Sequence, residues 1–383
     1  MVHMKRIVLT LTLLLILTLA FTEELLLISP AAMFPGYADL EHIVIDSNGT
    51  IEPAGMPITF SNGVYRLTGD ISNYSIYILC DNIVIDGAGF TLQGNRSNTP
   101  VGLIDAHGIC IEARSNVTIE NLNITTFEQG IWNLGSTGVN ITNNYITGCD
   151  QGITFVSNNM YIGSEGYAYV TAMNNTIMGN TIKGNGNGID LLGASYFNII
   201  DGNIISDNVD AGIYFQGDSN MVKSNIIMEN KRGVLLDSSN NTFIANSIAR
   251  NDEGIVLNSG SHVGSYNLFY LNDFINNSKA LAFGLKETVC LWDNGSVGNY
   301  WSNYTGIDAD SDGIGDNPYL VAASNNIDNY PLMTPYVMQT KGYQPQSQPF
   351  PTGPVAVASG ASIAAIAVGV LVYLRKRKRG QLT

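Results

Sequence analysis

Histidine and cysteine are scarce in this sequence, which has four of each among 383 residues. No two cysteines have the CxxC spacing of a metal-binding pair, and no other cysteine spacing typical of metal ligands occurs. The four cysteines could form disulfides outside a cell, but single buried thiols are the favoured interpretation; they are Cys80, Cys110, Cys149 and Cys290.

Basic residues are also few: the sequence has 18 lysines and arginines but 32 aspartates and glutamates, which gives a net charge of −14. Seven of the basic residues lie near the two ends, so the rest of the chain is more acidic still. An acidic surface repels nucleic acid and favours cations, which excludes a nucleic-acid partner. The same surface charge could equally serve solubility or tolerance of salt.

The two ends of the chain predict export and membrane anchoring. Residues 1–22 have a basic start and a short apolar core, which is typical of a cleaved signal peptide. Residues 354–374 contain the uncharged run Val355–Leu374, which is long enough to span a bilayer. Five basic residues follow at once, so residues 375–383 are expected in the cytoplasm. The sequence thus predicts a single-pass cell-membrane protein with an extracellular N-terminal ectodomain.

The middle of the chain repeats a triplet of asparagines spaced by five residues, and this repeat is the strongest pattern present. Successive central asparagines are separated by 23, 22, 21 and 26 residues. The five triplets are Asn175, Asn180, Asn185; Asn198, Asn203, Asn208; Asn220, Asn225, Asn230; Asn241, Asn246, Asn251; and Asn267, Asn272, Asn277.

A Gly-Ile or Gly-Val pair follows the first four central asparagines by eight or nine residues, as at Gly188-Ile189 and Gly212-Ile213. The period is too short for a βαβ unit and lacks a helical spacing. We therefore predict an all-β, right-handed parallel β-helix over residues 40–290, with roughly eleven turns. Its stacked asparagines would form hydrogen-bonded ladders and tolerate left-handed corners. Residues 291–335 would cap the solenoid, and residues 336–353, rich in proline and glutamine, would form a stalk.

An insertion interrupts the repeat, because Gly152 and Gly188 are 36 residues apart. Insertions in solenoids project as loops and often carry the binding face. Tyr161, Tyr167 and Tyr169 lie in this added length. They could belong to such a loop or simply pack within an irregular turn.

Several segments resemble the NosD-like right-handed β-helix proteins, which belong to a wider group of carbohydrate-binding proteins and sugar hydrolases. The resemblance rests on Val84–Gly87, on Asn116–Asn121 and the Gly-Ile turns, and covers about residues 40–335. Gly298–Tyr304, Asp308–Tyr319 and Asp328–Leu332 resemble the C-terminal part of archaeal surface members. The resemblance implies the fold; it leaves binding, scaffold and catalytic roles open and raises an association with copper-enzyme maturation.

The acidic segment after the repeats predicts a Ca²⁺ site. Its carboxylates alternate as in known calcium loops, and Gly313 permits the tight turn. A calcium ion here would pin the C-terminal cap, although Tyr319 stands where an EF-hand has glutamate, and an ordinary acidic turn is the alternative. The expected ligands are Asp308, Asp310, Asp312 and Asp316.

The residue after each Gly-Ile pair is expected to point outward. These positions are Trp132, Thr154, Asp190, Tyr214, Leu235 and Val256, one above another. Trp132 and Tyr214 could stack on sugar rings, with Gln216 and Asp237 nearby for hydrogen bonds. An apolar stripe hidden beneath another segment is the alternative.

Catalysis and copper binding have weaker support. The sequence has no Asn-Thr-Asp, Asp-Asp or Gly-His-Gly of the kind shared by β-helix hydrolases. A lyase base could come only from Lys231-Arg232 beside Asp207 and Asp210, which corner charges would also explain. Copper needs clustered His, Met or Cys, whereas His42, His107 and His262 fall at different repeat positions.

Eleven Asn-x-Ser/Thr sequons could be glycosylated after export, although an asparagine-rich repeat also creates them by chance, and ladder members such as Asn116 should be inaccessible. They start at Asn48, Asn73, Asn95, Asn116, Asn123, Asn140, Asn174, Asn240, Asn276, Asn294 and Asn303. Together these features predict a non-catalytic envelope protein that binds or displays glycan. A polysaccharide lyase or glycoside hydrolase and a NosD-like copper accessory protein are the alternatives.

Overall fold

The computed structural model describes residues 41–95, 107–161, 167–257, 266–283, 289–322 and 326–337. All of them lie in the first of two compact units, Met1–Tyr343. The expected signal peptide, transmembrane helix and cytoplasmic tail lie outside these residues, as does the stalk beyond residue 337. Within the described ranges, no helix is both long and apolar enough to cross a membrane.

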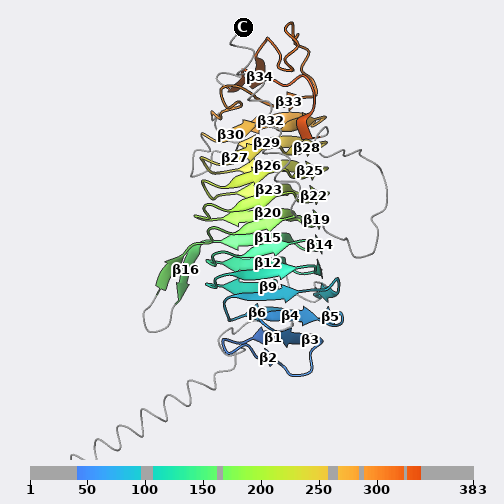
Figure 1. Cartoon of the computed structure of the whole chain (residues 1–383), viewed down its shortest axis with the longest axis vertical. Helices are drawn as coiled ribbons and strands as arrows, with labels where there is room; N and C mark the ends of the chain where they lie inside the picture. Colours follow the sequence, from blue (N-terminus) through green and yellow to red (C-terminus); the bar gives the residue numbers. More distant parts are fainter. Residues whose placement is uncertain are drawn as a thin grey trace, which may run out of the picture. The chain divides into compact units, whose positions relative to one another are not determined.

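The described chain is a right-handed-type parallel β-helix of about nine turns, as the asparagine repeat predicts. Each turn contributes one strand to each of three sheets, and Figure 1 shows the strands stacked turn upon turn. We call these sheets 1, 2 and 3 in the order in which a turn visits them.

Sheet 1 has eleven strands, in the order β2 (Ile51–Glu52), β1 (Glu41–Ile45), β6 (Tyr74–Ile78), β9 (His107–Glu112), β12 (Gln129–Leu134), β15 (Gln151–Val156), β20 (Asn187–Leu192), β23 (Ala211–Phe215), β26 (Arg232–Leu236), β29 (Glu253–Leu257) and β32 (Lys279–Phe283). Strand β2 pairs antiparallel with β1, and the other pairs are parallel.

Sheet 2 has ten strands: β3 (Ile58–Ser61), β4 (Val64–Leu67), β7 (Ile83–Asp86), β10 (Val117–Glu120), β13 (Asn140–Thr142), β18 (Thr176–Met178), β21 (Ile199–Asp201), β24 (Met221–Lys223), β27 (Thr242–Ile244) and β30 (Leu268–Tyr270). Sheet 3 also has ten: β5 (Ile71–Ser72), β8 (Thr91–Gln93), β11 (Asn123–Thr125), β14 (Tyr145–Thr147), β19 (Thr181–Lys183), β22 (Ile204–Ser206), β25 (Ile226–Met228), β28 (Ser247–Ala249), β31 (Asp273–Ile275) and β33 (Tyr300–Trp301).

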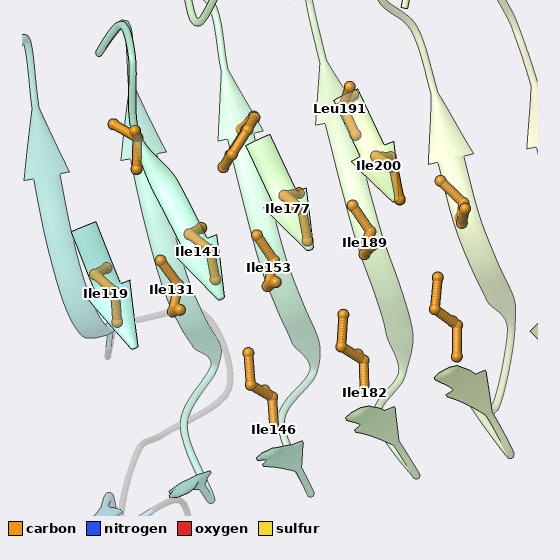
Figure 2. Close-up of a cluster of buried hydrophobic side chains, with 14 of the residues drawn as sticks. Ile119, Ile131, Ile141, Ile146, Ile153, Ile177, Ile182, Ile189, Leu191 and Ile200 are labelled. Atoms are coloured by element: carbon orange, nitrogen blue, oxygen red, sulfur yellow. The ribbon is translucent and has the colours of Figure 1, made fainter. Parts of the chain in front are cut away.

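The core consists of apolar side chains stacked in rows from turn to turn. Along sheet 1, Ile131 pairs with Ile153 and Ile153 with Ile189, and Figure 2 shows these side chains in one row. All three have no exposed surface. Burying one such side chain stabilises the fold by about 1.5–3 kcal/mol, so the repeated rows supply much of the driving force.

Three ladders of buried asparagine side chains run along the corners, which confirms the predicted role of the triplets. In the middle ladder, Asn203 Nδ2 donates to Asn225 Oδ1 at 2.9 Å, and Asn225 Nδ2 donates to Asn246 Oδ1 at 3.0 Å. Each Oδ1 also accepts the backbone N–H of the asparagine one turn earlier, as Asn225 does from Asn203 at 2.9 Å. Each ladder residue therefore satisfies buried backbone and side-chain groups at once.

The left-handed corner residue is not the ladder asparagine but the residue before it. Asn174 has a φ of 55° and precedes Asn175, which lies in a ladder. The prediction that Asn116 is an inaccessible ladder residue is wrong for this reason: Asn116 is itself a left-handed corner residue with a φ of 56°, and it is exposed.

The prediction of roughly eleven turns was too high because several turns are longer than 22 residues. Ile43 pairs with Ile76, which in turn pairs with Ile109, so each of these two turns takes 33 residues. The turn from Ile153 to Ile189 takes 36 residues. It contains an antiparallel hairpin, β16 (Asn158–Tyr161) and β17 (Tyr167–Val170), seen in green at the side of the stack in Figure 1.

The C-terminal end of the core is covered by aromatic rings. Trp301 stacks on Phe274 with ring centroids 4.3 Å apart, and Tyr319 stacks on Trp301 at 4.7 Å. Tyr319 begins the antiparallel hairpin of β34 (Tyr319–Ala322) and β35 (Asn326–Asp328). At the end of β35, Asp328 takes the place of an asparagine and terminates the middle ladder, where it accepts the backbone N–H of Asn299 at 2.8 Å.

Candidate functional site

The outer face of sheet 1 is the candidate site, and the Gly-Ile pairs determine which side chains reach it. A side chain on Gly212 would come within 2.6 Å of the carbonyl oxygen of Gly233 in the next turn, so only glycine fits this close approach. The isoleucine that follows points into the core, and the next residue therefore points outward.

The predicted outward residues do stack on one another from strand to strand. We call this row the outer column; its members pair in register as Trp132, Thr154, Asp190, Tyr214, Leu235 and Val256.

The outer column changes character along its length. Leu235 and Val256 are 8% and 7% exposed and form an apolar cluster with Ala211, against which Tyr214 packs. The alternative of a buried apolar stripe thus describes the column from β26 onward, and at the other end Trp132 packs on a second apolar cluster of Val44, Tyr77 and Cys110. Between the two clusters, Thr154 and Asp190 are buried as well, at 2% and 4% exposed. The candidate site is the earlier half, on strands β12, β15, β20 and β23.

Asp190 lies in the middle of this half. The residue is 4% exposed, and its carboxyl group accepts one hydrogen bond, from Asn187 Nδ2 to Oδ2 at 3.3 Å. Its other oxygen, Oδ1, is buried without a hydrogen-bond partner. Burial in these surroundings raises the pKa of Asp190 to about 7. Asp190 can therefore gain or lose a proton near neutral pH, and its Oδ1 can form a further hydrogen bond.

Three of the four residues predicted to bind glycan lie together. Gln216 Nε2 donates to the hydroxyl of Tyr214 at 2.6 Å, and Gln216 Oε1 accepts the backbone N–H of Gly193. Burial raises the pKa of Tyr214, and the nearby carboxylates of Asp237 and Asp190 add to this effect. These contacts hold the phenol ring of Tyr214 over the end of β23, with polar groups around it.

Trp132 lies apart from this group, three strand spacings or roughly 14 Å along the column from Tyr214. Its ring stacks on His107 with centroids 4.7 Å apart and an interplanar angle of 13°. The two aromatic rings therefore flank Thr154 and Asp190. Thr154 is 2% exposed, and its Oγ1 also lacks a hydrogen-bond partner.

A second row of polar residues was not foreseen from the sequence. Its members each come directly before a glycine of sheet 1 and are His107, Gln129, Gln151 and Asn187. Gln129 Nε2 donates to Gln151 Oε1 at 2.8 Å, while Gln129 Oε1 and His107 Nδ1 lack partners. Burial lowers the pKa of His107 to about 4, so its ring is neutral. The residue before each glycine was the sequence signal for this row.

We call the two rows on β9 to β23 the polar patch; it consists of His107, Gln129, Trp132, Gln151, Thr154, Asn187, Asp190 and Tyr214. Buried polar atoms without a hydrogen-bond partner cost free energy, so this face has unused capacity for hydrogen bonds.

The basic residues considered for catalysis are already paired. Arg232 donates from Nε to Asp210 Oδ1 at 2.9 Å and from Nη2 to the other oxygen of the same carboxylate. Lys231 lies 3.9 Å from Asp210, and Asp207 pairs instead with Lys183 at 3.3 Å. These charges lie at the corners, as the alternative interpretation had it, and they form ion pairs there.

The residues present do not fit a copper site. His107 and His42 lie on sheet 1, and His262 lies outside the described residues. Among the His, Cys, Asp and Glu side chains that the structure describes, the one group of three with ligand atoms within 4.8 Å of one another consists of carboxylates. Copper in proteins prefers nitrogen and sulfur donors, whereas carboxylate oxygens suit hard cations.

That carboxylate group is the predicted acidic loop, and it contains Asp308, Asp310 and Asp312. Asp308 shapes the loop by accepting the backbone N–H groups of Asp312 at 3.1 Å and Gly313 at 3.0 Å. Gly313 has a φ of 87°, as the tight turn requires. Asp316, the fourth expected ligand, is not in the group and accepts the backbone N–H of Ala309 at 2.8 Å.

The four cysteines, all in the described part of the chain, form no disulfide bond: Cys110, Cys149 and Cys290 are buried and Cys80 is partly exposed. The favoured interpretation of single buried thiols is thus confirmed for three of them.

Comparison with known proteins gives one family match. The model of the NosD family, described as periplasmic copper-binding protein, matches residues 81–306. No curated protein matches the chain.

Solved structures similar to this chain include two enzymes and a phage protein. The alginate lyase from Paenibacillus sp. str. FPU-7 is 13% identical with a TM-score of 0.41, covering 61% of this chain and 95% of that chain. The A-module of the Azotobacter vinelandii mannuronan C-5 epimerase AlgE6 is 14% identical with a TM-score of 0.38, covering 60% and 88%. A tailspike protein mutant of E. coli bacteriophage HK620 is 13% identical with a TM-score of 0.39, covering 61% and 48%. At identities and TM-scores this low, the similarity supports no conclusion about activity.

Proposed function

The chain belongs to the NosD family, and from this membership together with the polar patch we propose that it is a non-catalytic, glycan-binding protein of the cell envelope. The observation that carries the proposal is the set of buried, unpartnered polar atoms on the outer face of sheet 1. In this proposal a glycan lies along the outer column and supplies the missing hydrogen bonds.

The residue types in the patch suit a sugar ligand. Trp132 and Tyr214 offer aromatic faces for the apolar side of a sugar ring, and Asp190 and Thr154 between them offer bonds to hydroxyl groups. Adjacent strands are about 4.8 Å apart, close to the length of one sugar unit. A linear glycan parallel to the solenoid axis would therefore meet one strand for each sugar.

Binding is favoured over cleavage because hydrolysis needs two carboxyl groups across one bond. Asp190 is the one carboxylate of the outer column. Of the two other carboxylates at this end, Asp210 is engaged by Arg232, and Asp237 lies outside the column beside Tyr214. A polysaccharide lyase or hydrolase remains the second candidate, supported by Asp190 and Tyr214 on neighbouring strands. A carboxyl group with a pKa of about 7 beside a phenol is a combination used in acid–base catalysis.

Equilibrium binding on a glycan array, followed by product analysis with soluble polysaccharides, separates these candidates. We expect retention of glycan without products. Trp132→Ala and Tyr214→Ala should weaken binding by about tenfold or more, which corresponds to about 1.4 kcal/mol. Tyr145→Ala, which removes an exposed aromatic ring from sheet 3, should leave binding unchanged. Released oligosaccharides would refute the non-catalytic role.

The cell-envelope location rests on the two ends of the sequence. We propose that residues 1–22 direct export and that residues 354–374 anchor the β-helix outside the cell membrane, with residues 375–383 in the cytoplasm. A family described as periplasmic is consistent with export. Protease treatment of intact cells should remove the β-helix and leave a short membrane fragment; full protection would contradict this orientation.

Two further features complete the proposal. A Ca²⁺ ion bound by Asp308, Asp310 and Asp312, with Asp316 close in sequence, would stabilise the C-terminal cap, which the convergence of three carboxylates supports. N-glycosylation would occur at exposed sequons such as Asn116, which mass spectrometry of the protein from its native host would detect.

A further inference from the structure

If the polar patch binds a glycan as proposed, the charges around it determine whether that glycan is charged or uncharged. Three carboxylates lie at the β20–β26 end of the patch: Asp190, Asp210 and Asp237. Asp210 and Asp237 both act on the ionisation of groups in the patch, the first on Asp190 and the second on Tyr214. Among the charged groups that act on Tyr214, the two carboxylates of Asp237 and Asp190 outnumber the one cation, Arg232.

The neighbouring cations are already engaged. Arg232 makes two hydrogen bonds to Asp210, and Lys231 lies beside the same carboxylate. At the other end, beyond β9, Arg114 donates from Nε to the carbonyl oxygen of Glu112 and from Nη1 to that of Leu79. Among the described residues around the patch, no further lysine or arginine faces Asp190 to neutralise an acidic sugar. Acidic sugars are usually recognised by a free arginine or lysine, which can bond a carboxylate directly.

The unpartnered atoms also select for hydroxyl groups. Asp190 Oδ1 and Gln129 Oε1 are oxygen atoms that accept hydrogen bonds, and Thr154 Oγ1 can donate or accept. A sugar hydroxyl can do both, so it satisfies any of these atoms. A uronate carboxylate only accepts, so it would meet Gln129 Oε1 and the ionised form of Asp190 acceptor to acceptor.

We infer that the outer face of sheet 1 selects an uncharged glycan and rejects polyuronates, with Asp190 Oδ1 and Thr154 Oγ1 bonding hydroxyl groups of the sugar. The groups facing Asp190 are Thr154 from β15, Asn187 from its own strand and Tyr214 from β23, with Asp210 nearby. None of these side chains is a cation. As pH rises through about 7, Asp190 loses its proton and the rejection of anionic sugars strengthens.

The test uses the full-length protein and two sets of soluble oligosaccharides. Uncharged glucan, mannan and galactan fragments form the first set, and polygalacturonate and polymannuronate fragments the second. Isothermal titration calorimetry at pH 8 should give binding of at least one uncharged fragment at least tenfold tighter than of any polyuronate. Because the discrimination is electrostatic, it should shrink at high ionic strength.

Two variants locate the discrimination. Asp190→Asn keeps an acceptor in place but removes the charge, so it should reduce the preference for uncharged fragments by about threefold or more. Asp207→Asn removes an exposed carboxylate at a corner, where it pairs with Lys183, and should leave the preference unchanged. Equal effects of the two variants would overturn the inference.

The outcomes also separate the inference from the proposal beneath it. Tighter binding of a polyuronate than of every uncharged fragment would overturn the inference and leave glycan binding standing. Failure of all fragments to bind, under conditions where the protein is folded, would overturn the proposed function itself.

Discussion

Replacing Asn225 with alanine tests how much one ladder residue contributes to the fold. Asn225 is fully buried, and its side chain takes part in five hydrogen bonds. Its Oδ1 accepts from the backbone N and from Nδ2 of Asn203, both at 2.9 Å. Its Nδ2 donates to the carbonyls of Ile200 and Lys223 at 2.9 Å and to Asn246 Oδ1 at 3.0 Å.

The alanine variant would leave two buried backbone groups without these partners, the N–H of Asn203 and the carbonyl of Ile200. Each such group costs about 1–3 kcal/mol, so the free energy of unfolding should fall by about 2–6 kcal/mol. The vacated volume adds to this loss.

Urea unfolding followed by circular dichroism measures the change. Asn240→Gly is the matched control, because Asn240 is an exposed left-handed corner residue directly before the ladder residue Asn241. Glycine readily adopts that conformation, so the control should change stability by less than about 1 kcal/mol. Equal losses in Asn225→Ala and Asn240→Gly would refute the view that the ladder bonds stabilise the solenoid.

Three further outcomes follow from the same structure. Burial raises the pKa of Asp328 from 3.8 to about 6. Between these two pH values the folded protein keeps the proton of Asp328 and the unfolded chain has lost it. The free energy of unfolding should therefore fall by roughly 3 kcal/mol as the pH rises from about 4 to about 6. Urea titrations across that pH range should show no such fall for the Asp328→Asn variant. The same pH dependence of the free energy of unfolding in both proteins would contradict this assignment to Asp328. Adding a chelator should lower the melting temperature of the wild type but not that of Asp310→Asn; an unchanged wild type would argue against the calcium site. Gly212→Ala should destabilise the protein by about 1–3 kcal/mol, because its Cβ would lie 2.6 Å from the carbonyl oxygen of Gly233, whereas Gly69→Ala should be tolerated, since its nearest contact is 3.5 Å.

The sequence predicts the stacked architecture because a ladder needs asparagine at one position in every turn. Asn203, Asn225 and Asn246 therefore keep a regular spacing that is visible without coordinates. The number of turns was less predictable, because a long turn such as the one between Ile153 and Ile189 adds residues without adding a layer. Spacing also cannot separate a ladder asparagine from the left-handed residue before it, which is why Asn116 was misassigned.

The sequence predicted which residues form the outer column, but not which of their polar atoms lack hydrogen-bond partners. Alternation along each strand places Trp132 and Tyr214 outward, as predicted. The unpartnered oxygen of Asp190 depends on burial by neighbouring strands, and the sequence contains no direct signal of it. Likewise, His107 gains its place beneath Trp132 only through the register of β9 and β12.

The most direct test of the proposed function is a crystal structure of the protein with the tightest-binding oligosaccharide from the titrations. We expect electron density for the sugar along sheet 1, with rings near Trp132 and Tyr214 and a hydroxyl within hydrogen-bonding distance of Asp190 Oδ1. Density bound to sheet 2, to sheet 3 or to the β16–β17 hairpin, with the outer column of sheet 1 bare, would contradict the account.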